Sequence, residues 1–327
     1  FHLVLTGAFT EVDGQPNGLG DAMGLFLDGS NALVFELFPA DPGSDFFGVT
    51  EGEVDFDNLF GARRLRILGS EGDDTAAGGA VQDTLSGGTG ADRLDGAGGN
   101  DLVSGGGGDD LLFGDLGADR LDGGARHDTL RGGDGNDELF GRGGNDRLFG
   151  DGDNDLLNGG AGADVLRGGA GVNTLIGAGG KDRLIGGASG GEELFGGAGV
   201  DTLEGRAGGD DLVGGGGDDR LRGQDGDDRL SGGAGGNLLV GGAGADAHVL
   251  GESLDGVHRV LGFDPGSDLI RIEREFAPKG EDVTKADAKF QKLAADSRTI
   301  ITFFDETMIL EGVLVARKDV TFSIEPP

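Results

Sequence analysis

The sequence has no cysteine, tryptophan or tyrosine among its 327 residues, and only two methionines. The absence of cysteine excludes disulfides and thiolate chemistry and is compatible with any redox compartment. No apolar run approaches the 18 or more residues that a membrane-spanning helix needs. Basic residues are also scarce, because 26 Lys and Arg stand against 60 Asp and Glu, a formal net charge of −34. Such a chain, with no basic stripe in its sequence, is not expected to bind nucleic acid.

Catalytic signatures are equally scarce. The four histidines, His2, His127, His248 and His258, are scattered, and no His-Glu-x-x-His zinc motif is present. Gly187-Ala188-Ser189-Gly190-Gly191 matches the esterase pattern Gly-x-Ser-x-Gly, but it lacks the strand–turn–helix context of a nucleophile elbow. We therefore expect no enzyme contained wholly within these residues. The chain shows no signal peptide and begins without Met, which is compatible with a fragment or a processed product.

Glycine is abundant, with 74 residues. Many of these glycines belong to a nine-residue unit, Gly-Gly-x-Gly-x-Asp-x-Leu-x, which repeats over residues 69–249. Laid end to end, this segment holds 20 units, and a single one of them, residues 186–195, has ten residues. The sixth position is Asp in 17 units, and the eighth is Leu in 17. A flexible Gly/Asp-rich linker would not keep leucine in register, so this segment is predicted to be folded.

The positions of the unit have distinct physical roles. Glycines at positions one, two and four allow the positive φ of a tight turn. The Asp at position six supplies a hard anionic oxygen, which calcium prefers together with backbone carbonyls. The x-Leu-x triplet predicts a short strand, so that two units make one 18-residue coil and coils stack as parallel strands about 4.8 Å apart. The double row of leucines is a thin core, so we expect bound metal to complete an all-β solenoid.

The unit resembles the nonapeptide of the RTX (repeats-in-toxin) haemolysin-type family, whose repeats form a parallel calcium-binding β-roll. The resemblance implies that each Ca²⁺ lies between turns two units apart. One turn gives the carbonyls of its second and fourth residues and its Asp, and the other gives the carbonyls of its first and third residues and its Asp. Gly88, Gly90 and Asp92 would then share an ion with Gly105, Gly107 and Asp110, and Gly133, Gly135 and Asp137 would face Gly150, Gly152 and Asp155.

The same resemblance makes every sixth-position aspartate a candidate calcium ligand. The remaining candidates are Asp74, Asp83, Asp101, Asp119, Asp128, Asp146, Asp164, Asp182, Asp201, Asp210, Asp219, Asp228 and Asp246. Of the 18 pairs of turns, 14 have Asp at both sixth positions, and the exceptions involve Asn173, Glu192 and Asn237. About 14 Ca²⁺ would add 28 positive charges to the formal net charge of −34 and leave about −6, an ordinary value for a soluble protein. We expect the turns around Asn173 and Glu192, beside the ten-residue unit, to lose one to three ions.

Residues 250–327 are predicted to close the end of the repeats. Two alternating strands flank Asp264-Pro265-Gly266-Ser267 and predict a hairpin. A short helix is predicted over 284–295, followed by a second hairpin from 299–304 and 307–313 and a last strand within 319–324. This region resembles the uncleaved C-terminal export region of RTX proteins that use type I secretion. The resemblance implies the type I machinery as a partner and an extracellular location, outside a Gram-negative cell.

Residues 1–68 are predicted to form a small β cap. Residues 22–27 and 32–38 alternate around Asp28-Gly29-Ser30-Asn31 as in a hairpin, and 63–68 resemble a strand that leads into the first coil. Leu5-Thr6-Gly7-Ala8, Glu11, Gly20 and Leu25-Phe26-Leu27 show a weaker resemblance to the start of a CHRD (chordin-type) domain. The His-x-His motif usual in that family is missing, so a cap is the favoured interpretation.

Two classes of function remain. The first is a secreted calcium-binding structural or interaction protein, a rod that meets a cell-surface or matrix polysaccharide or a second copy of itself. The alternative is the C-terminal calcium-dependent module of a secreted RTX enzyme, such as a protease, lipase or polysaccharide epimerase, with its catalytic domain upstream of residue 1. We favour the first, with domains at 1–68, 69–249 and 250–327.

Overall fold

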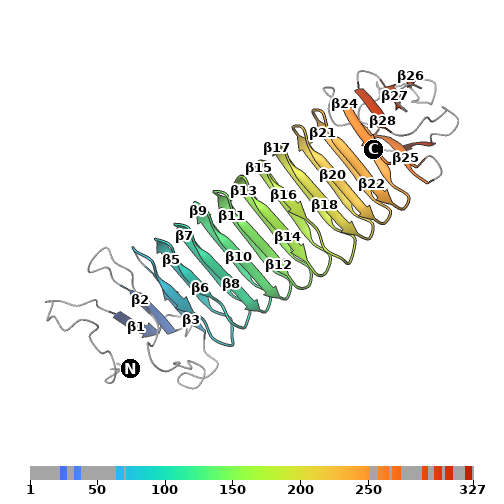
Figure 1. The fold of residues 1–327 in the computed structure, drawn as a ribbon. Coiled ribbons are helices and arrows are strands. Elements are labelled where there is room, and N and C mark those ends of the chain that lie inside the picture. The colour runs from blue at the N-terminus through green and yellow to red at the C-terminus, as the bar shows by residue number, and fades with distance from the viewer. Residues whose placement is uncertain are drawn as a thin grey trace. The chain divides into compact units, whose positions relative to one another are not determined.

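The computed structural model describes residues 23–27, 33–37, 64–69, 71–250, 257–264, 267–273, 289–293, 298–303, 306–311 and 321–325. Within these ranges the chain forms 29 β-strands (Figure 1). No helix there is long and apolar enough to cross a membrane. The chain divides into two compact units, Phe1–Glu138 and Leu139–Pro327, and each is described by itself.

The first unit contains two sheets, A and B, whose strands alternate along the chain. Sheet A follows the order β1 (Met23–Leu27), β2 (Leu33–Leu37), β3 (Leu65–Leu68), β5 (Thr84–Thr89), β7 (Leu102–Gly107) and β9 (Arg120–Ala125). Sheet B contains β4 (Thr75–Ala77), β6 (Arg93–Asp95), β8 (Leu111–Leu116) and β10 (Thr129–Asp134). β1 and β2 are antiparallel, as the sequence predicted, and the pairs that follow are parallel.

The second unit has the same two-sheet plan. Its sheet A starts with β11 (Glu138–Gly143), which begins at the boundary, and continues with β13 (Leu156–Gly162), β15 (Thr174–Gly180), β17 (Glu193–Gly199), β19 (Asp211–Gly216), β21 (Arg229–Ala234), β23 (Ala247–Leu250), β25 (Leu269–Glu273) and β29 (Thr321–Glu325). Its sheet B contains β12 (Arg147–Asp151), β14 (Val165–Gly169), β16 (Arg183–Ile185), β18 (Thr202–Ala207), β20 (Arg220–Asp225), β22 (Leu238–Ala243), β24 (Val257–Leu261), β28 (Glu306–Glu311), β27 (Arg298–Phe303) and β26 (Lys289–Leu293).

The register repeats every 18 residues, which confirms the predicted coil of two units. Leu157 pairs with Leu175 in sheet A, and Leu148 pairs with Leu166 in sheet B. The ten-residue unit lengthens the offset to 19, since Leu175 pairs with Leu194, and the leucine row continues without a slip. The turn therefore absorbs the extra residue and the strands do not.

The eighth-position side chains form the core between the sheets. Leu94, Leu112 and Leu130 of the first unit and Leu148 and Leu212 of the second are all 0% exposed. Successive strand residues point to opposite faces, so the seventh and ninth positions on either side of each leucine face outward. The core holds one large apolar side chain in each unit except the first and the last, where Ala76 and His248 stand, and it is as thin as the sequence predicted.

Tight approach between neighbouring turns explains the glycines. Gly106 has φ +109°, and a Cβ there would lie 2.3 Å from the carbonyl oxygen of Gly88 in the preceding coil. Any side chain would therefore collide with backbone and also strain the left-handed conformation. By contrast, a Cβ on the next residue, Gly107, would meet no atom closer than 3.9 Å.

The predicted hairpin around Asp264 is wrong. β24 pairs in parallel with β22 and β28 in sheet B, whereas β25 pairs in parallel with β23 and β29 in sheet A. Residues 257–264 and 267–270 therefore belong to one more degenerate coil. The alternating pattern fits either arrangement, and burial of Val260 and Ile270 (each 0% exposed) in line with the leucine rows favours the coil.

The helix predicted over 284–295 is also wrong within the described residues, because Lys289–Leu293 is strand β26. Its antiparallel pairing with β27 overrides the local helix signal. Residues 284–288 and 294–295 lie outside the described residues. The second predicted hairpin is confirmed, since β27 and β28 are antiparallel, and the last predicted strand is β29. The segments that resemble a CHRD domain lie outside the described residues, except for Leu25-Phe26-Leu27 within β1.

Candidate metal centres in the turns

The sixth-position aspartates are buried in the turns. All 17 of them are between 0% and 4% exposed, from Asp74 in the first unit to Asp246 in the second. The sixth residue lies two positions before the core leucine, so its side chain points to the same inner side. Burial of so many carboxylates is costly unless each has a compensating partner.

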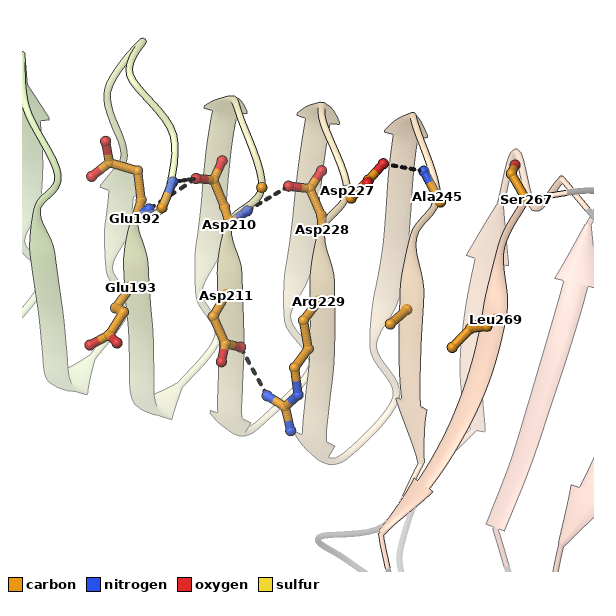
Figure 2. A pocket seen from close by; sticks show the side chains of 13 residues that line it. Glu192, Glu193, Asp210, Asp211, Asp227, Asp228, Arg229, Ala245, Ser267 and Leu269 are labelled. Carbon is orange, nitrogen blue, oxygen red and sulfur yellow. Dashed lines mark hydrogen bonds and ion pairs between the residues drawn. The ribbon is translucent and has the colours of Figure 1, made fainter. Parts of the chain in front are cut away.

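One hydrogen bond repeats along each row of turns. The backbone N–H of Asp92 donates to Oδ1 of Asp110, 2.8 Å away and one coil later. The same bond joins Asp210 to Asp228 at 2.9 Å in the second unit (Figure 2). A carboxylate that accepts this bond is thereby fixed against the turn of the preceding coil through one of its two oxygens.

The other carboxylate oxygen of many of these groups has no such partner. In many of these groups, Oδ2 (or Oε1 of glutamate) is buried and has no hydrogen-bond partner: Asp92, Asp101, Asp110, Asp119, Asp164, Asp182, Glu192, Asp201, Asp210, Asp219, Asp228 and Asp246. An unsatisfied buried polar atom costs about 1–3 kcal/mol, and more when charged. The sum would exceed the 5–15 kcal/mol stability typical of a domain, so these carboxylates need a compensating cation or must take up protons.

These oxygens converge with backbone carbonyls. A Cβ on Gly177 would lie 2.6 Å from Oδ2 of Asp182 and 2.6 Å from the carbonyl oxygen of Gly196. One coil later, a Cβ on Gly196 would lie 2.7 Å from Oδ2 of Asp201 and 2.5 Å from the carbonyl oxygen of Gly214. Glycine at the first position thus leaves open a small space bordered by a carboxylate and a carbonyl.

Burial raises the pKa of these carboxyl groups. Desolvation is the largest cause, and the charges of neighbouring aspartates add to it, while the hydrogen bond from the preceding turn lowers the pKa. The pKa of Asp92 and of Asp219 is raised to about 6, and that of Asp101, Asp182 and Asp228 to about 7. A cation between the turns would oppose this shift, because a nearby positive charge favours the ionised form.

The donor set fits calcium. Carboxylate and carbonyl oxygens are the ligands of Ca²⁺, whereas Zn²⁺ prefers nitrogen and sulfur. No cluster of three or more His, Cys, Asp or Glu side chains that could hold a metal occurs in the described part of the chain. A site of two carboxylates completed by carbonyls does not need such a cluster.

The fold brings together the first predicted set of calcium ligands, which comes from the turns that end at Asp92 and Asp110. Gly90 donates its N–H to the carbonyl oxygen of Gly107 at 2.8 Å, and the carboxylate of Asp110 accepts from Asp92. A Cβ on Gly105 would lie 2.2 Å from Oδ2 of Asp110. The two turns are therefore adjacent on one edge, although the carbonyl of Gly107 already accepts a hydrogen bond.

The second predicted set of calcium ligands has one half in each of the two units. In the first unit, Gly133 and Gly135 have φ +118° and +125° and lie in the turn that ends at the buried Asp137. In the second unit, a Cβ on Gly150 would lie 2.2 Å from Oδ2 of Asp155. Gly152, the other residue of this half, lies in the bend between Gly150 and Asp155.

The asparagine turns satisfy themselves without a cation. Oδ1 of Asn173 accepts from the backbone N–H of Asp155 at 2.9 Å, as an aspartate would. Its Nδ2 donates to the carbonyl oxygen of Ala170 at 3.3 Å, and Nδ2 of Asn237 donates to that of Gly233 at 3.2 Å. The amide nitrogen thus supplies a donor at the place where an aspartate leaves an unpaired oxygen.

Glu192 keeps the hydrogen-bond row intact through the ten-residue unit. Its Oε2 accepts from the backbone N–H of Asn173 at 2.8 Å, and its own N–H donates to Oδ1 of Asp210 at 3.0 Å. Glu192 is 0% exposed and its Oε1 is unpaired, so the longer side chain takes the aspartate's place. The expected loss of ions here remains a prediction.

Sequence reasoning missed the residues that extend both rows into the last coil. Oδ1 of Asp268 accepts from the N–H of Asp246 at 3.2 Å, and Nδ1 of His258 lies 3.2 Å from Nδ2 of Asn237. The signal was the spacing, because Asp268 and His258 each stand two residues before the buried Ile270 and Val260. Inserted residues lengthen the coil and hide this pattern.

A second row of hydrogen bonds on the outside of the turns was also missed. The side chains of fifth-position Asp or Asn accept from the backbone N–H of the fifth residue one coil later. Oδ1 of Asp109 accepts from His127 at 3.1 Å, and Oδ1 of Asp227 accepts from Ala245 at 2.8 Å (Figure 2). Either residue type performs this role, so a search for carboxylates alone does not find it.

Parallel coils whose turns bury half-paired carboxylates beside glycine carbonyls define a calcium-binding repeat solenoid. The chain belongs to the family described as the RTX calcium-binding nonapeptide repeat, and the repeats bind calcium. The family matches residues 68–103, 86–121, 96–130, 122–157, 158–189, 186–221 and 213–247, which together span more than half of the chain.

Other comparisons add less. No curated protein matches the sequence. Among solved structures, the chain is similar to the extracellular lipase LipA from Serratia marcescens, with 20% sequence identity and a TM-score of 0.30. The match covers 63% of this chain and 40% of the lipase chain.

Proposed function

We propose that the chain is a secreted RTX protein whose repeats fold on binding Ca²⁺ outside the cell and then act as a structural or interaction element. The unpaired Oδ2 atoms, repeated along both rows of turns, carry the proposal. They leave a buried anionic oxygen beside a carbonyl in turn after turn, which a divalent cation would pair.

The ligands of each ion would come from two turns one coil apart. In the first unit, Gly88, Gly90 and Asp92 would face Gly105, Gly107 and Asp110, and the other sixth-position aspartates would repeat this pattern for up to about 14 ions. When bound, the ions would neutralise carboxylates and link consecutive turns. The chain's own part is to fix the orientation of each carboxylate through the hydrogen bond from the preceding turn.

We further propose that residues 250–327 serve type I export. Low calcium inside the cell would leave the acidic repeats unfolded and able to pass through a channel, and calcium outside would fold them. Charge repulsion in a chain with a net charge of −34 supports the unfolded state inside. The division into 1–68, 69–249 and 250–327 is part of this proposal, with 257–264 and 267–270 as part of a further coil.

Secretion of a truncated chain tests the export role. Deleting residues 274–327 retains the last coil with its buried Ile270, and it should abolish secretion while leaving calcium binding by the purified repeats unchanged. A matched deletion of residues 1–63 should be secreted normally. Secretion of both truncated chains at the level of the full chain would contradict the export role.

The alternative function is a C-terminal module of a larger RTX enzyme. The coding sequence upstream of Phe1 distinguishes the two functions. A catalytic domain there would replace the structural role by that of a calcium-dependent accessory module, whereas its absence would support the first proposal.

A further inference from the structure

The outward face of sheet B in the second unit is rich in arginine. At the seventh and ninth positions of β12 to β20 lie Arg147, Arg167, Arg183, Arg220 and Arg222, all exposed. Among these positions, Glu204 is the acidic residue. We call these five arginines the arginine face. The sequence shows no basic stripe, because Arg147, Arg183 and Arg220, which the fold places in one column, stand 36 or 37 positions apart.

Strands β12, β14 and β16 lie side by side in sheet B (Figure 1), and the arginines follow their register. Arg147 pairs with Val165, and Val165 pairs with Arg183, so two arginines of one column are two strands apart. Beyond them, Arg183 pairs with Thr202 and Thr202 with Arg220, which repeats the interval. With strands about 4.8 Å apart, consecutive arginines in this column lie about 10 Å apart.

Sheet A of the same unit has a different outward face. Its seventh positions include Glu193, Asp211 and Arg229, and Arg229 forms an ion pair with Asp211 at 2.9 Å. Glu193 and Asp211 outnumber the single arginine there. The positive charge of these coils is therefore concentrated on sheet B, while the acidic residues lie mostly in the turns.

Much of the arginine face is available to a partner. Among the residues that the structure describes, Arg147, Arg220 and Arg222 form no ion pair. Arg183 pairs with Glu204 at 3.2 Å, yet its side chain remains 52% exposed. Arg167 lies over the ring of Phe149 at 5.9 Å, which holds its guanidinium against the sheet. Planar guanidinium groups bind carboxylate or sulfate groups with two parallel hydrogen bonds.

We propose that the arginine face binds an acidic polysaccharide, laid along the stack of coils. The proposal rests on the proposed function, because the column exists only in the folded repeats. The regular spacing and flat strands suit a linear polymer, and the guanidinium groups suit its anionic substituents. Thr202, between two arginines of the column, offers a hydroxyl for neutral sugar groups.

The arginine spacing is too sparse to pair most phosphates of a nucleic acid. Phosphates recur every 3.4 Å along one strand of a duplex, so arginines of one column, which recur about every 10 Å, would meet about one phosphate in three. Base stacking on single strands uses exposed aromatic rings, and Phe149, the aromatic residue at the outward positions of β12 to β20, already lies against the guanidinium of Arg167. The acidic turns beside the face would also repel a polymer of such high charge density.

The test measures binding of the full chain to hyaluronan, a carboxylated polysaccharide, at constant free calcium and low salt. Folding is first confirmed by circular dichroism. The combined variant Arg147→Gln, Arg183→Gln and Arg220→Gln should weaken binding by about threefold to a hundredfold, since each exposed charge pair contributes about 0.2–1 kcal/mol. High salt should abolish binding, and neutral dextran should not bind.

A matched control removes three positive charges elsewhere in the second unit. It combines Lys181→Gln, Arg206→Gln and Arg229→Gln. Because these residues lie outside the arginine face, the affinity for hyaluronan should fall by less than about twofold, no more than one weak exposed charge pair contributes. Gln is tolerated at Arg206, because its register partner Gln224 has nearly the same positive φ of 85° against 87°.

The outcomes separate the two proposals. A chain that does not fold with calcium contradicts the proposed function. A calcium-folded chain that fails to bind hyaluronan, or binds it equally after the arginine substitutions, overturns the arginine face. Tighter binding of duplex DNA through the same arginines overturns it in favour of nucleic acid.

Discussion

The backbone N–H of Asp210 donates to Oδ1 of Asp228 at 2.9 Å, while Oδ2 of each aspartate is buried without a hydrogen-bond partner (Figure 2). One oxygen of each carboxylate thus aligns consecutive coils, and the other is left beside the turn carbonyls. The alignment needs no metal, but the unpaired charge opposes folding until a cation arrives. The same aspartate therefore aligns the coils through Oδ1 and needs a bound cation to pair Oδ2.

Two adjacent aspartates should respond differently to the same substitution. Asp110→Asn should cost about two bound ions, because Asp110 belongs to two predicted sites, whereas Asp109→Asn should cost none. Asn173 shows that asparagine keeps the hydrogen-bond row at the sixth position, so the variant should fold. Calcium stoichiometry by titration calorimetry measures both. Equal stoichiometry of the two variants would contradict the ligand assignment.

The reverse substitution should add a site. Asn173→Asp replaces an amide that donates to Ala170 with an unpaired oxygen, so it should raise the number of bound ions by about one or two and destabilise the chain in chelator. Asn154→Asp is the control, since Asn154 occupies a fifth position and accepts from Val172. Ion counting should detect a gain in the first variant alone.

Acid should partly replace calcium. The pKa of Asp101, Asp182 and Asp228 is raised from 3.8 to about 7 in the folded chain. The folded state then binds more protons than the unfolded state between about pH 4 and pH 7. Stability without metal should therefore rise as the pH falls through this window and be lost as the pH rises. Circular dichroism in chelator should show β structure appearing on acidification.

General relief of charge repulsion would also favour folding in acid, so this prediction needs a matched pair of variants. Replacing Asp101, Asp182 and Asp228 with Asn should flatten the pH dependence. Replacing the exposed Asp134, Glu193 and Asp225 with their amides should leave most of it. The same slope in both variants would show that the buried aspartates do not cause the effect.

The repeats could be predicted because their determinants are local. The glycine, aspartate and leucine of each unit recur within nine residues, and each position has one physical role. The last coil escaped because its determinants are not local. Asp268 accepts a hydrogen bond from Asp246, 22 residues earlier in the sequence. The strands on either side of Asp268 alternate apolar and polar residues, as the strands of a hairpin also do.

Long-range pairing also explains the other differences. Lys289–Leu293 has a helical signal that strand pairing overrides. Arg147 and Arg183 lie in one column through the register of three strands, and nothing in their immediate sequence reveals it. Hydrogen-bond satisfaction decides the role of Asn173, whose amide nitrogen donates where the neighbouring aspartates leave an oxygen unpaired.

Circular dichroism during a calcium titration, starting in chelator at neutral pH, tests the central claim most directly. The account predicts a largely disordered chain in chelator and a cooperative gain of β structure at roughly 10⁻⁴ to 10⁻³ M Ca²⁺, the range of extracellular calcium modules. Magnesium at the same concentration should be less effective, because it demands a smaller and more rigid octahedral site. A β-rich spectrum in chelator that calcium does not change would contradict the account.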